Sequence, residues 1–137
     1  MKTVFVDTNI LIDLLADRLP YSKFAINLFD LAEKEKVKLY TSSYSYATTH
    51  YLLKKYIGET ALRTVLLTLL DFIEIVPIDL AIIKKILLSK HKDFEDAIQI
   101  FAANAIANID FIVTRNLKDF KDAGVIVLPP DELLNHL

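Results

Sequence analysis

Acidic and polar side chains follow two apolar runs that lie near opposite ends of the chain. The runs are Val4–Val6 and Phe111–Val113. The residues after them that could bind a cation or a phosphate are Asp7 and Asn9 at the first run, and Thr114, Arg115, Asn116 and Asp119 at the second. Because α/β proteins gather functional groups at the carboxyl edge of a parallel sheet, we expect these two sets to lie close together.

Two further acids open a segment that is apolar almost all round. Asp93 and Asp96 introduce Ala97–Ala107, which predicts a buried helix. A carboxylate at the mouth of a buried helix needs a compensating partner, because an unpaired buried charge is costly. When several acids converge, the residue types favour a divalent cation bound by oxygen ligands.

Each acid also has a structural explanation that needs no metal. Asp7 could accept hydrogen bonds from backbone N–H groups where a strand turns into a helix. Asp93 suits a helix N-cap, with Asp96 at the capping-box position three residues later. Asp119 alone would be an ordinary surface acid. Convergence of three such acids at one sheet edge favours a metal site over three coincidences.

Length and composition predict one compact domain that spans residues 1–137. The chain has 137 residues, of which 53% are hydrophobic, so it can bury a sizeable core. It has no cysteine, which excludes disulfides and thiolate zinc sites and suits a cytoplasmic location. No apolar stretch approaches the roughly 20 residues that span a bilayer, so we expect neither a membrane span nor a signal peptide.

The net charge of −2 argues against a protein that coats nucleic acid nonspecifically. A local basic surface around an acidic centre is still compatible with it, because a metal offsets the repulsion between carboxylates and phosphate. The lysines and arginines that could form one are Lys54, Lys55, Arg63, Lys84, Lys85, Lys90, Lys92, Arg115, Lys118 and Lys121. Most of these are expected to lie on ordinary solvated helix faces.

Strand and helix patterns alternate along the chain. The predicted strands are Thr3–Val6, Val37–Tyr40, Phe72–Val76, Phe111–Val113 and Val125–Leu128. The predicted helices cover 10–16, 22–36, a segment after 41–43 that ends before 58, 60–70, 79–89, 97–107 and the C-terminus, with a short turn at 117–121. Helical crossovers between strands give a parallel sheet covered on both faces, so the fold class is α/β, a three-layer α/β/α sandwich with a mainly parallel central sheet.

Several residues mark the ends and faces of these helices. Ser22 suits an N-cap, and Gly58 suits a C-cap for the helix after the second strand. Within that helix we expect Ala47, Tyr51 and Leu52 to face inward. Five tyrosines cluster here, and packing or a protein interface is favoured over base stacking because no basic run is interleaved with them. They are Tyr40, Tyr44, Tyr46, Tyr51 and Tyr56.

Three motifs together resemble the signatures of PIN domains, the ribonuclease fold of VapC-type toxins. They are Val-Phe-Val-Asp-Thr-Asn at 4–9, Asp-Phe-Glu-Asp-Ala at 93–97 and Thr-Arg-Asn-Leu-Lys-Asp-Phe at 114–120. The resemblance implies that Asp7, Asp96 and Asp119 hold Mg²⁺ or Mn²⁺, with Asn116 and Asp93 beside them. It also implies endonucleolytic cleavage of RNA by a toxin that is blocked by a cognate antitoxin protein. Surplus apolar surface would fit a homodimer.

Other residues of the motifs extend this predicted site. Asn9 and Thr114 are expected to be polar neighbours of the acids, and Arg115 and Lys118 flank the last motif where they could contact backbone phosphates.

One position departs from the family pattern. In these domains a glutamate on the helix after the second strand usually joins the acidic cluster, but here Thr48 stands at that place. A hydroxyl carries no charge, so metal affinity should fall. His50 lies roughly 200° further round the helix and should not replace the missing ligand. Whether Asp13 or Asp93 compensates is open.

Three functions from different classes follow from these observations. The first is a metal-dependent endoribonuclease, the toxin of a toxin–antitoxin pair. The second is a PIN-like binding module that has lost catalysis together with its glutamate. The third, a haloacid-dehalogenase-like phosphotransferase, needs a second aspartate two residues after the first, and this chain has Asn9 there.

Overall fold

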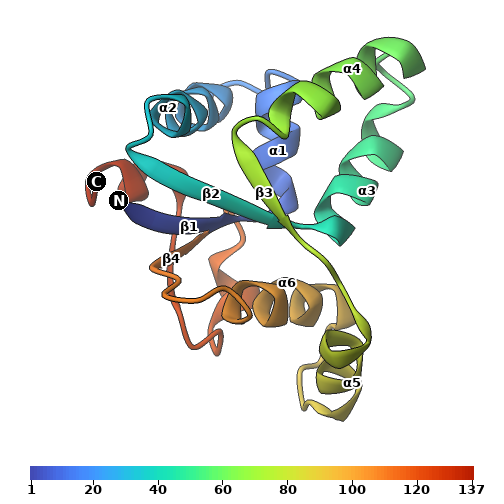
Figure 1. The fold of residues 1–137 in the computed structure, drawn as a ribbon, viewed down its shortest axis with the longest axis vertical. Helices are drawn as coiled ribbons and strands as arrows, with labels where there is room; N and C mark the ends of the chain where they lie inside the picture. The colour runs from blue at the N-terminus through green and yellow to red at the C-terminus, as the bar shows by residue number, and fades with distance from the viewer.

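The computed structural model describes residues 1–137 and contains a five-stranded sheet in the order β3-β2-β1-β4-β5 (Figure 1). All four neighbouring pairs are parallel. The strands are β1 (Lys2–Val6), β2 (Val37–Ser42), β3 (Ile73–Val76), β4 (Phe111–Val113) and β5 (Ile126–Leu128). Each predicted strand is confirmed to within two residues at either end.

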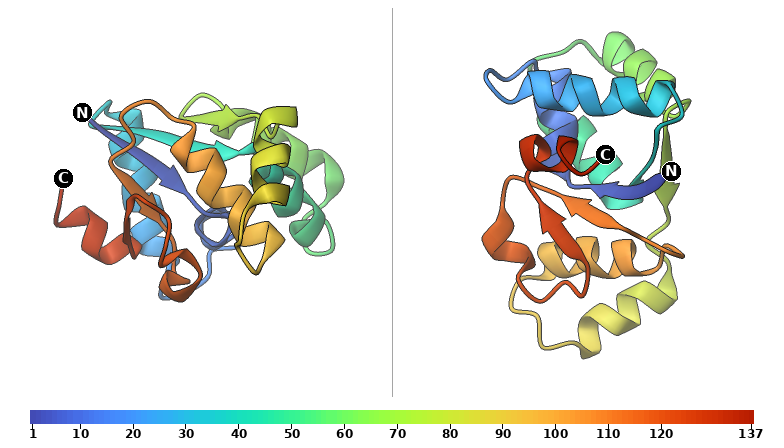
Figure 2. Two further views of the ribbon diagram at one scale, coloured as in Figure 1. Left: turned by 90° about the horizontal axis from the view of Figure 1, so that it is seen from below. Right: turned by 90° about the vertical axis from the view of Figure 1, so that its left-hand side faces the viewer.

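Seven α-helices and one 3-10 turn connect the strands. They are α1 (Thr8–Leu15), α2 (Ser22–Glu33), α3 (Ser43–Leu53), α4 (Glu59–Leu69), α5 (Leu80–Leu88), α6 (Phe94–Asn104), η1 (Leu117–Phe120) and α7 (Pro130–Leu134). Helices α1 to α4 lie on one side of the sheet and α5 and α6 on the other (Figures 1 and 2). The α/β class and the three-layer sandwich are therefore confirmed.

The alternation of side chains along β1 divides the core into two halves. Val4 and Val6 face the cluster that includes α1 and α2, while Phe5 faces the cluster that includes α5 and α6. All three side chains are fully buried. The central strand is therefore covered on both faces, as expected for the middle of a parallel sheet.

Two predicted helix caps are wrong. Ser22 is the first residue of α2 and is buried, and the N-cap is Tyr21. Helix α3 ends at Leu53, and Gly58 is the N-cap of α4 instead of the C-cap of α3. With a φ of −56°, Gly58 does not use the left-handed conformation that makes glycine a frequent C-cap.

The predicted inward face of α3 is also wrong. Ala47, Tyr51 and Leu52 are exposed, whereas Ser45, Thr49 and Leu53 are buried. Polar residues can take the inner face because their hydroxyls find partners there: the Thr49 hydroxyl donates to the Ser45 carbonyl at 2.7 Å. The apolar residues are left on the outside.

No helix combines the length and the apolar character that crossing a membrane would require.

Candidate active site

Asp7 lies at the carboxyl end of β1, where two strands and two helices meet. Its backbone N–H donates to the Val113 carbonyl of β4 at 3.0 Å, and it is the N-cap of α1. The side chain is 8% exposed. The expectation that Asp7 accepts a backbone hydrogen bond at this turn is confirmed, because Oδ1 accepts from Thr8 N at 2.8 Å.

Three side chains also donate to the Asp7 carboxylate. Gln99 Nε2 donates to Oδ1 at 2.9 Å, and Thr114 Oγ1 donates to Oδ2 at 2.8 Å. Asn9 Nδ2 lies 3.5 Å from Oδ2 and 3.2 Å from Thr114 Oγ1. These donors hold the Asp7 carboxylate in one orientation.

Gln99 of α6 is the centre of a buried polar network that sequence reasoning missed. It is 3% exposed, its amide N–H also donates to Ser45 Oγ at 2.6 Å, and its carbonyl accepts from Ser42 Oγ at 2.6 Å. Because the amide nitrogen faces carboxylate oxygen Oδ1 of Asp7 and the amide oxygen faces the Ser42 hydroxyl, the orientation of the Gln99 amide is fixed. The sequence did contain a signal for this network: Gln99 stands inside the apolar run 97–107, and a buried amide needs hydrogen-bond partners.

A cleft of about 290 Å³ opens above this network. It is lined by Asp7, Thr8, Asn9, Ile12, Arg18, Tyr44, Thr48, Leu52, Glu95, Asp96, Gln99 and Asn116. The predicted site residues that line it are Asp7, Asn9, Thr48, Asp96 and Asn116. Those that do not are Asp93, Thr114, Arg115 and Asp119.

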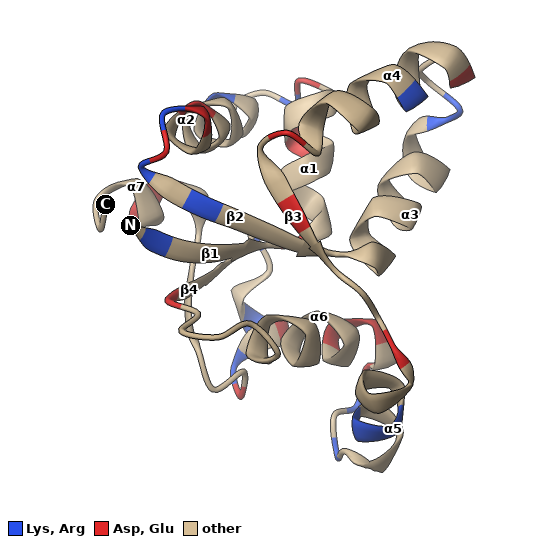
Figure 3. Cartoon of the chain, viewed as in Figure 1, with Lys and Arg blue, Asp and Glu red and all other residues tan.

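Asp96 carries the strongest electrostatic perturbation in the cleft. Burial and, after it, the negative charges of Asp119, Asp93, Asp7 and Glu95 together raise the pKa of its carboxyl from 3.8 to about 6. Asp7 and Asp119 are therefore close enough to Asp96 to disfavour its ionisation, although both lie far from it in the sequence. Acids at the start of α6 are visible in Figure 3.

Asp119 lies at the edge of this site. It is exposed on η1 and lines an adjoining hollow, which also includes Asn116 of the main cleft. Asp93 is exposed and is the N-cap of α6, accepting from Asp96 N at 2.9 Å. This capping role was one of the two explanations that the sequence offered for Asp93.

Arg115 is engaged in an ion pair with Asp13 of α1. Its Nε and Nη2 donate to the two oxygens of Asp13 at 2.7 and 3.0 Å, and its guanidinium lies 4.0 Å from the centre of the Tyr21 ring. Arg18 Nε donates to the same carboxylate at 3.1 Å. Asp13 is 1% exposed. Since two arginines neutralise it, Asp13 does not replace the missing glutamate.

Thr48, which the sequence comparison expects at a glutamate position, lies in the cleft wall. His50 does not face the cleft, because its Nε2 lies 2.8 Å from Glu59 of α4. Glu95 of α6 is an additional acid in the wall, and the sequence interpretation did not include it. The negative charge of this cleft therefore comes from Asp7, directly after β1, and from α6, and not from α3.

The donor chemistry of the cleft fits a hard divalent cation. Its ligands would be carboxylate, amide and hydroxyl oxygens, as Mg²⁺ and Mn²⁺ prefer. The pKa of Asp96 is raised first by burial and then by neighbouring negative charge, and a cation would offset that charge. No three acidic or histidine side chains form a ready-made ligand set. The arrangement suits Mg²⁺, which retains several waters and needs few protein ligands.

Comparison with known proteins relates this fold to a family. A family model described as "PIN domain" matches residues 3–125. A toxin–antitoxin complex from Klebsiella pneumoniae contains a chain that is 26% identical, with 93% of this chain and 97% of that chain covered and a TM-score of 0.67. No curated protein gives a significant match.

Two further solved structures share the fold at lower identity. They are VapBC2 from Rickettsia felis bound to a promoter DNA fragment (20% identity, 93% and 98% covered, TM-score 0.64) and FitAcB from Neisseria gonorrhoeae (20% identity, 93% and 97% covered, TM-score 0.59). The family model covers most of the chain, and the acidic cleft lies at the sheet edge that the three motifs predicted. The chain belongs to the PIN domain family.

Proposed function

We propose that this protein is a metal-dependent endoribonuclease and the toxin component of a toxin–antitoxin pair. The observation that carries the proposal is the acidic cleft in which Asp7 and Asp96, from β1 and α6, come together within a PIN fold. The toxin–antitoxin context is supported by the solved complexes that share this fold.

The residues that would hold Mg²⁺ or Mn²⁺ are Asp7 and Asp96, with Asp119 at the rim. When bound, the ion would act as a Lewis acid toward the phosphodiester and lower the pKa of a bound water. The chain itself orients the ligands: Gln99 and Thr114 fix the Asp7 carboxylate from opposite sides.

A direct test is cleavage of single-stranded RNA by the purified protein with Mn²⁺. Asp7→Asn and Asp96→Asn should each abolish cleavage, since each removes a carboxylate of the cleft. Asp71→Asn is the matched control, because Asp71 is exposed after α4 and its side chain makes no hydrogen bond or ion pair. Full activity in both cleft variants would identify a contaminating nuclease and contradict the proposal.

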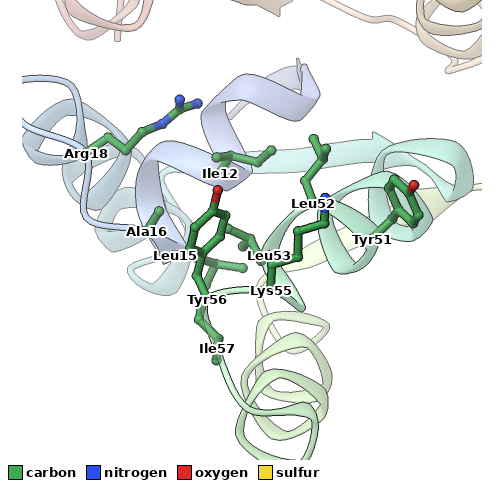
Figure 4. Close-up of a pocket in the computed structure, with 10 residues that line it drawn as sticks. All are labelled: Ile12, Leu15, Ala16, Arg18, Tyr51, Leu52, Leu53, Lys55, Tyr56 and Ile57. Atoms are coloured by element: carbon green, nitrogen blue, oxygen red, sulfur yellow. The ribbon is translucent and has the colours of Figure 1, made fainter.

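An apolar groove beside the cleft is a candidate binding site for the antitoxin. It has a volume of about 730 Å³ and runs between the end of α1 and the end of α3, with Leu15, Leu52 and Tyr56 among its walls (Figure 4). Ile12, Arg18 and Leu52 line both the groove and the cleft. A partner segment with apolar anchors would therefore reach the cleft and block it.

The groove can be tested with the product of a neighbouring reading frame. Tyr56→Glu places a charge in the groove and should abolish co-purification of the antitoxin. Leu67→Glu is the control, because Leu67 is 70% exposed on α4 and lies outside the groove. If both variants retain the antitoxin equally, the groove is not the antitoxin-binding site.

A homodimer is proposed from an apolar row on α5. Leu80, Ile83 and Leu87 follow helical spacing and are 66%, 37% and 67% exposed. Sedimentation of the protein should give a dimer, and Leu87→Lys should give a monomer.

The alternative function is a PIN-like binding module without catalysis, and Thr48 is the observation that favours it. Such a module would retain antitoxin binding but show no cleavage with either metal. The cleavage assay above separates the two functions.

A further inference from the structure

Arg18 is the only cationic side chain among the residues that line the cleft. It follows α1, and its side chain is 48% exposed. Its Nε donates to Asp13 Oδ1, and the guanidinium makes no other hydrogen bond or ion pair. Since a guanidinium has five N–H donors, the four on its two terminal nitrogens remain available.

The surroundings hold Arg18 in place without cancelling its charge. The Asp13 carboxylate carries one negative charge and is shared with Arg115, which binds both of its oxygens. The backbone is fixed as well, because Arg18 N donates to the Asp13 carbonyl at 3.1 Å and the Arg18 carbonyl accepts from Ser22 N at 2.8 Å. Two arginines around one acid leave a net positive charge at the cleft rim.

A phosphodiester that enters this cleft meets the carboxylates of Asp7, Glu95 and Asp96. A cation at the rim offsets that repulsion, and arginine presents paired donors that match two phosphate oxygens. Arg115 cannot serve in this way, because Asp13 and the Tyr21 ring occupy it. Arg18 also stands at the end of the adjoining groove opposite Tyr51 (Figure 4).

We propose that Arg18 binds a backbone phosphate of the RNA strand at the mouth of the cleft. This inference rests on the proposed ribonuclease function and names a substrate contact for it. The competing explanation is that Arg18 only neutralises Asp13, in which case its removal changes stability but not the electrostatics of RNA binding.

The test is RNA binding by Asp96→Asn protein, which the proposed function expects to bind a single-stranded oligonucleotide without cleaving it. Binding of a fluorescent oligouridylate is measured between about 50 and 200 mM NaCl. Each phosphate contact contributes about 0.7 to the slope of log K against log salt for single strands. Adding Arg18→Gln should reduce the slope by about 0.7 and weaken binding at low salt.

Arg63→Gln is the matched control. Arg63 is exposed on α4 and pairs with one carboxylate, Glu59, but lies outside the cleft. It should leave the slope unchanged. Urea denaturation tests whether each variant is folded. If Arg18→Gln does not fold, the binding of RNA by Arg18→Lys tests the inference instead. Lysine keeps the charge and loses the paired donors, so the slope should remain while affinity falls several-fold.

Equal slopes for the parent, Arg18→Gln and Arg63→Gln would overturn the inference and leave the ribonuclease proposal intact. Unchanged affinity of a folded Arg18→Lys protein would do the same. Absence of RNA binding by the Asp96→Asn parent would overturn both the inference and the proposed function.

Discussion

Asp96→Asn should stabilise the metal-free protein at alkaline pH, although it alters a residue of the cleft. Burial and the neighbouring acids raise the pKa of Asp96 from 3.8 to about 6 in the folded state. Because the folded state binds this proton more tightly than the unfolded state, Asp96 favours folding below pH about 4. This contribution is lost as the pH rises through about 6, and asparagine does not lose it.

The magnitude follows from the difference between the two pKa values. For a fully sheltered carboxyl it would correspond to about 3 kcal/mol. Asp96 is only half-buried, so solvent screening reduces the expected gain to about 1 kcal/mol. The Asp96 side chain makes no hydrogen bond in the structure, so no bond is lost on substitution. A gain of this size raises the melting temperature by about 4 °C.

The assay is thermal unfolding with a chelator present, at pH 4.5 and pH 8. The Asp96→Asn protein should melt at about the wild-type temperature at pH 4.5 and above it at pH 8. Asp71→Asn should show no such dependence on pH. A variant whose stability relative to wild type is the same at both pH values would refute the electrostatic reasoning, and the acids would then not be crowded.

The remaining predictions concern the network around Asp7, the glutamate position and the packing of α3. Gln99→Met keeps the side-chain volume but removes three hydrogen bonds. It should lower the free energy of unfolding, measured in urea, by about 2–4 kcal/mol and weaken Mn²⁺ binding, measured by calorimetry, about tenfold. Unchanged Mn²⁺ affinity would mean that Asp7 binds the metal without orientation by Gln99. Thr48→Glu adds a carboxylate to the cleft wall and should tighten Mn²⁺ binding about tenfold, and no change would show that Thr48 is not at the glutamate position. Tyr46→Phe removes the hydrogen bond to the Leu66 carbonyl and should cost about 1 kcal/mol, with no effect on Mn²⁺ affinity. In the wild type, burial raises the pKa of Tyr46 to about 12, so ultraviolet titration should show a phenol that ionises near pH 12 and is lost in the Tyr46→Phe protein.

The strands and the location of the cleft could be predicted from sequence because both depend on local patterns. An apolar run followed by an acid identifies a strand end, and parallel strands bring such ends to one edge. Asp7 was found in this way, and Asp96 was found as an acid at the start of the apolar segment 97–107. Their wide separation in sequence did not matter, because the sheet topology brings them together.

The inner face of α3 and the partners of Arg115 could not be predicted, because both depend on long-range polar contacts. Ser45 is buried on account of Gln99, which lies 54 residues away. Arg115 does not line the cleft, and its guanidinium pairs with Asp13, 102 residues away. Hydrophobic periodicity contains no information about such pairs.

The position of β1 in the middle of the sheet has a consequence for synthesis of the protein. Strand β1 is synthesised before β4, its neighbour in the sheet, and the Asp7 carboxylate needs Gln99 and Thr114 as hydrogen-bond donors. These two donors lie 92 and 107 residues further along the chain. A nascent chain that has not yet reached them therefore carries Asp7 without the side chains that orient it.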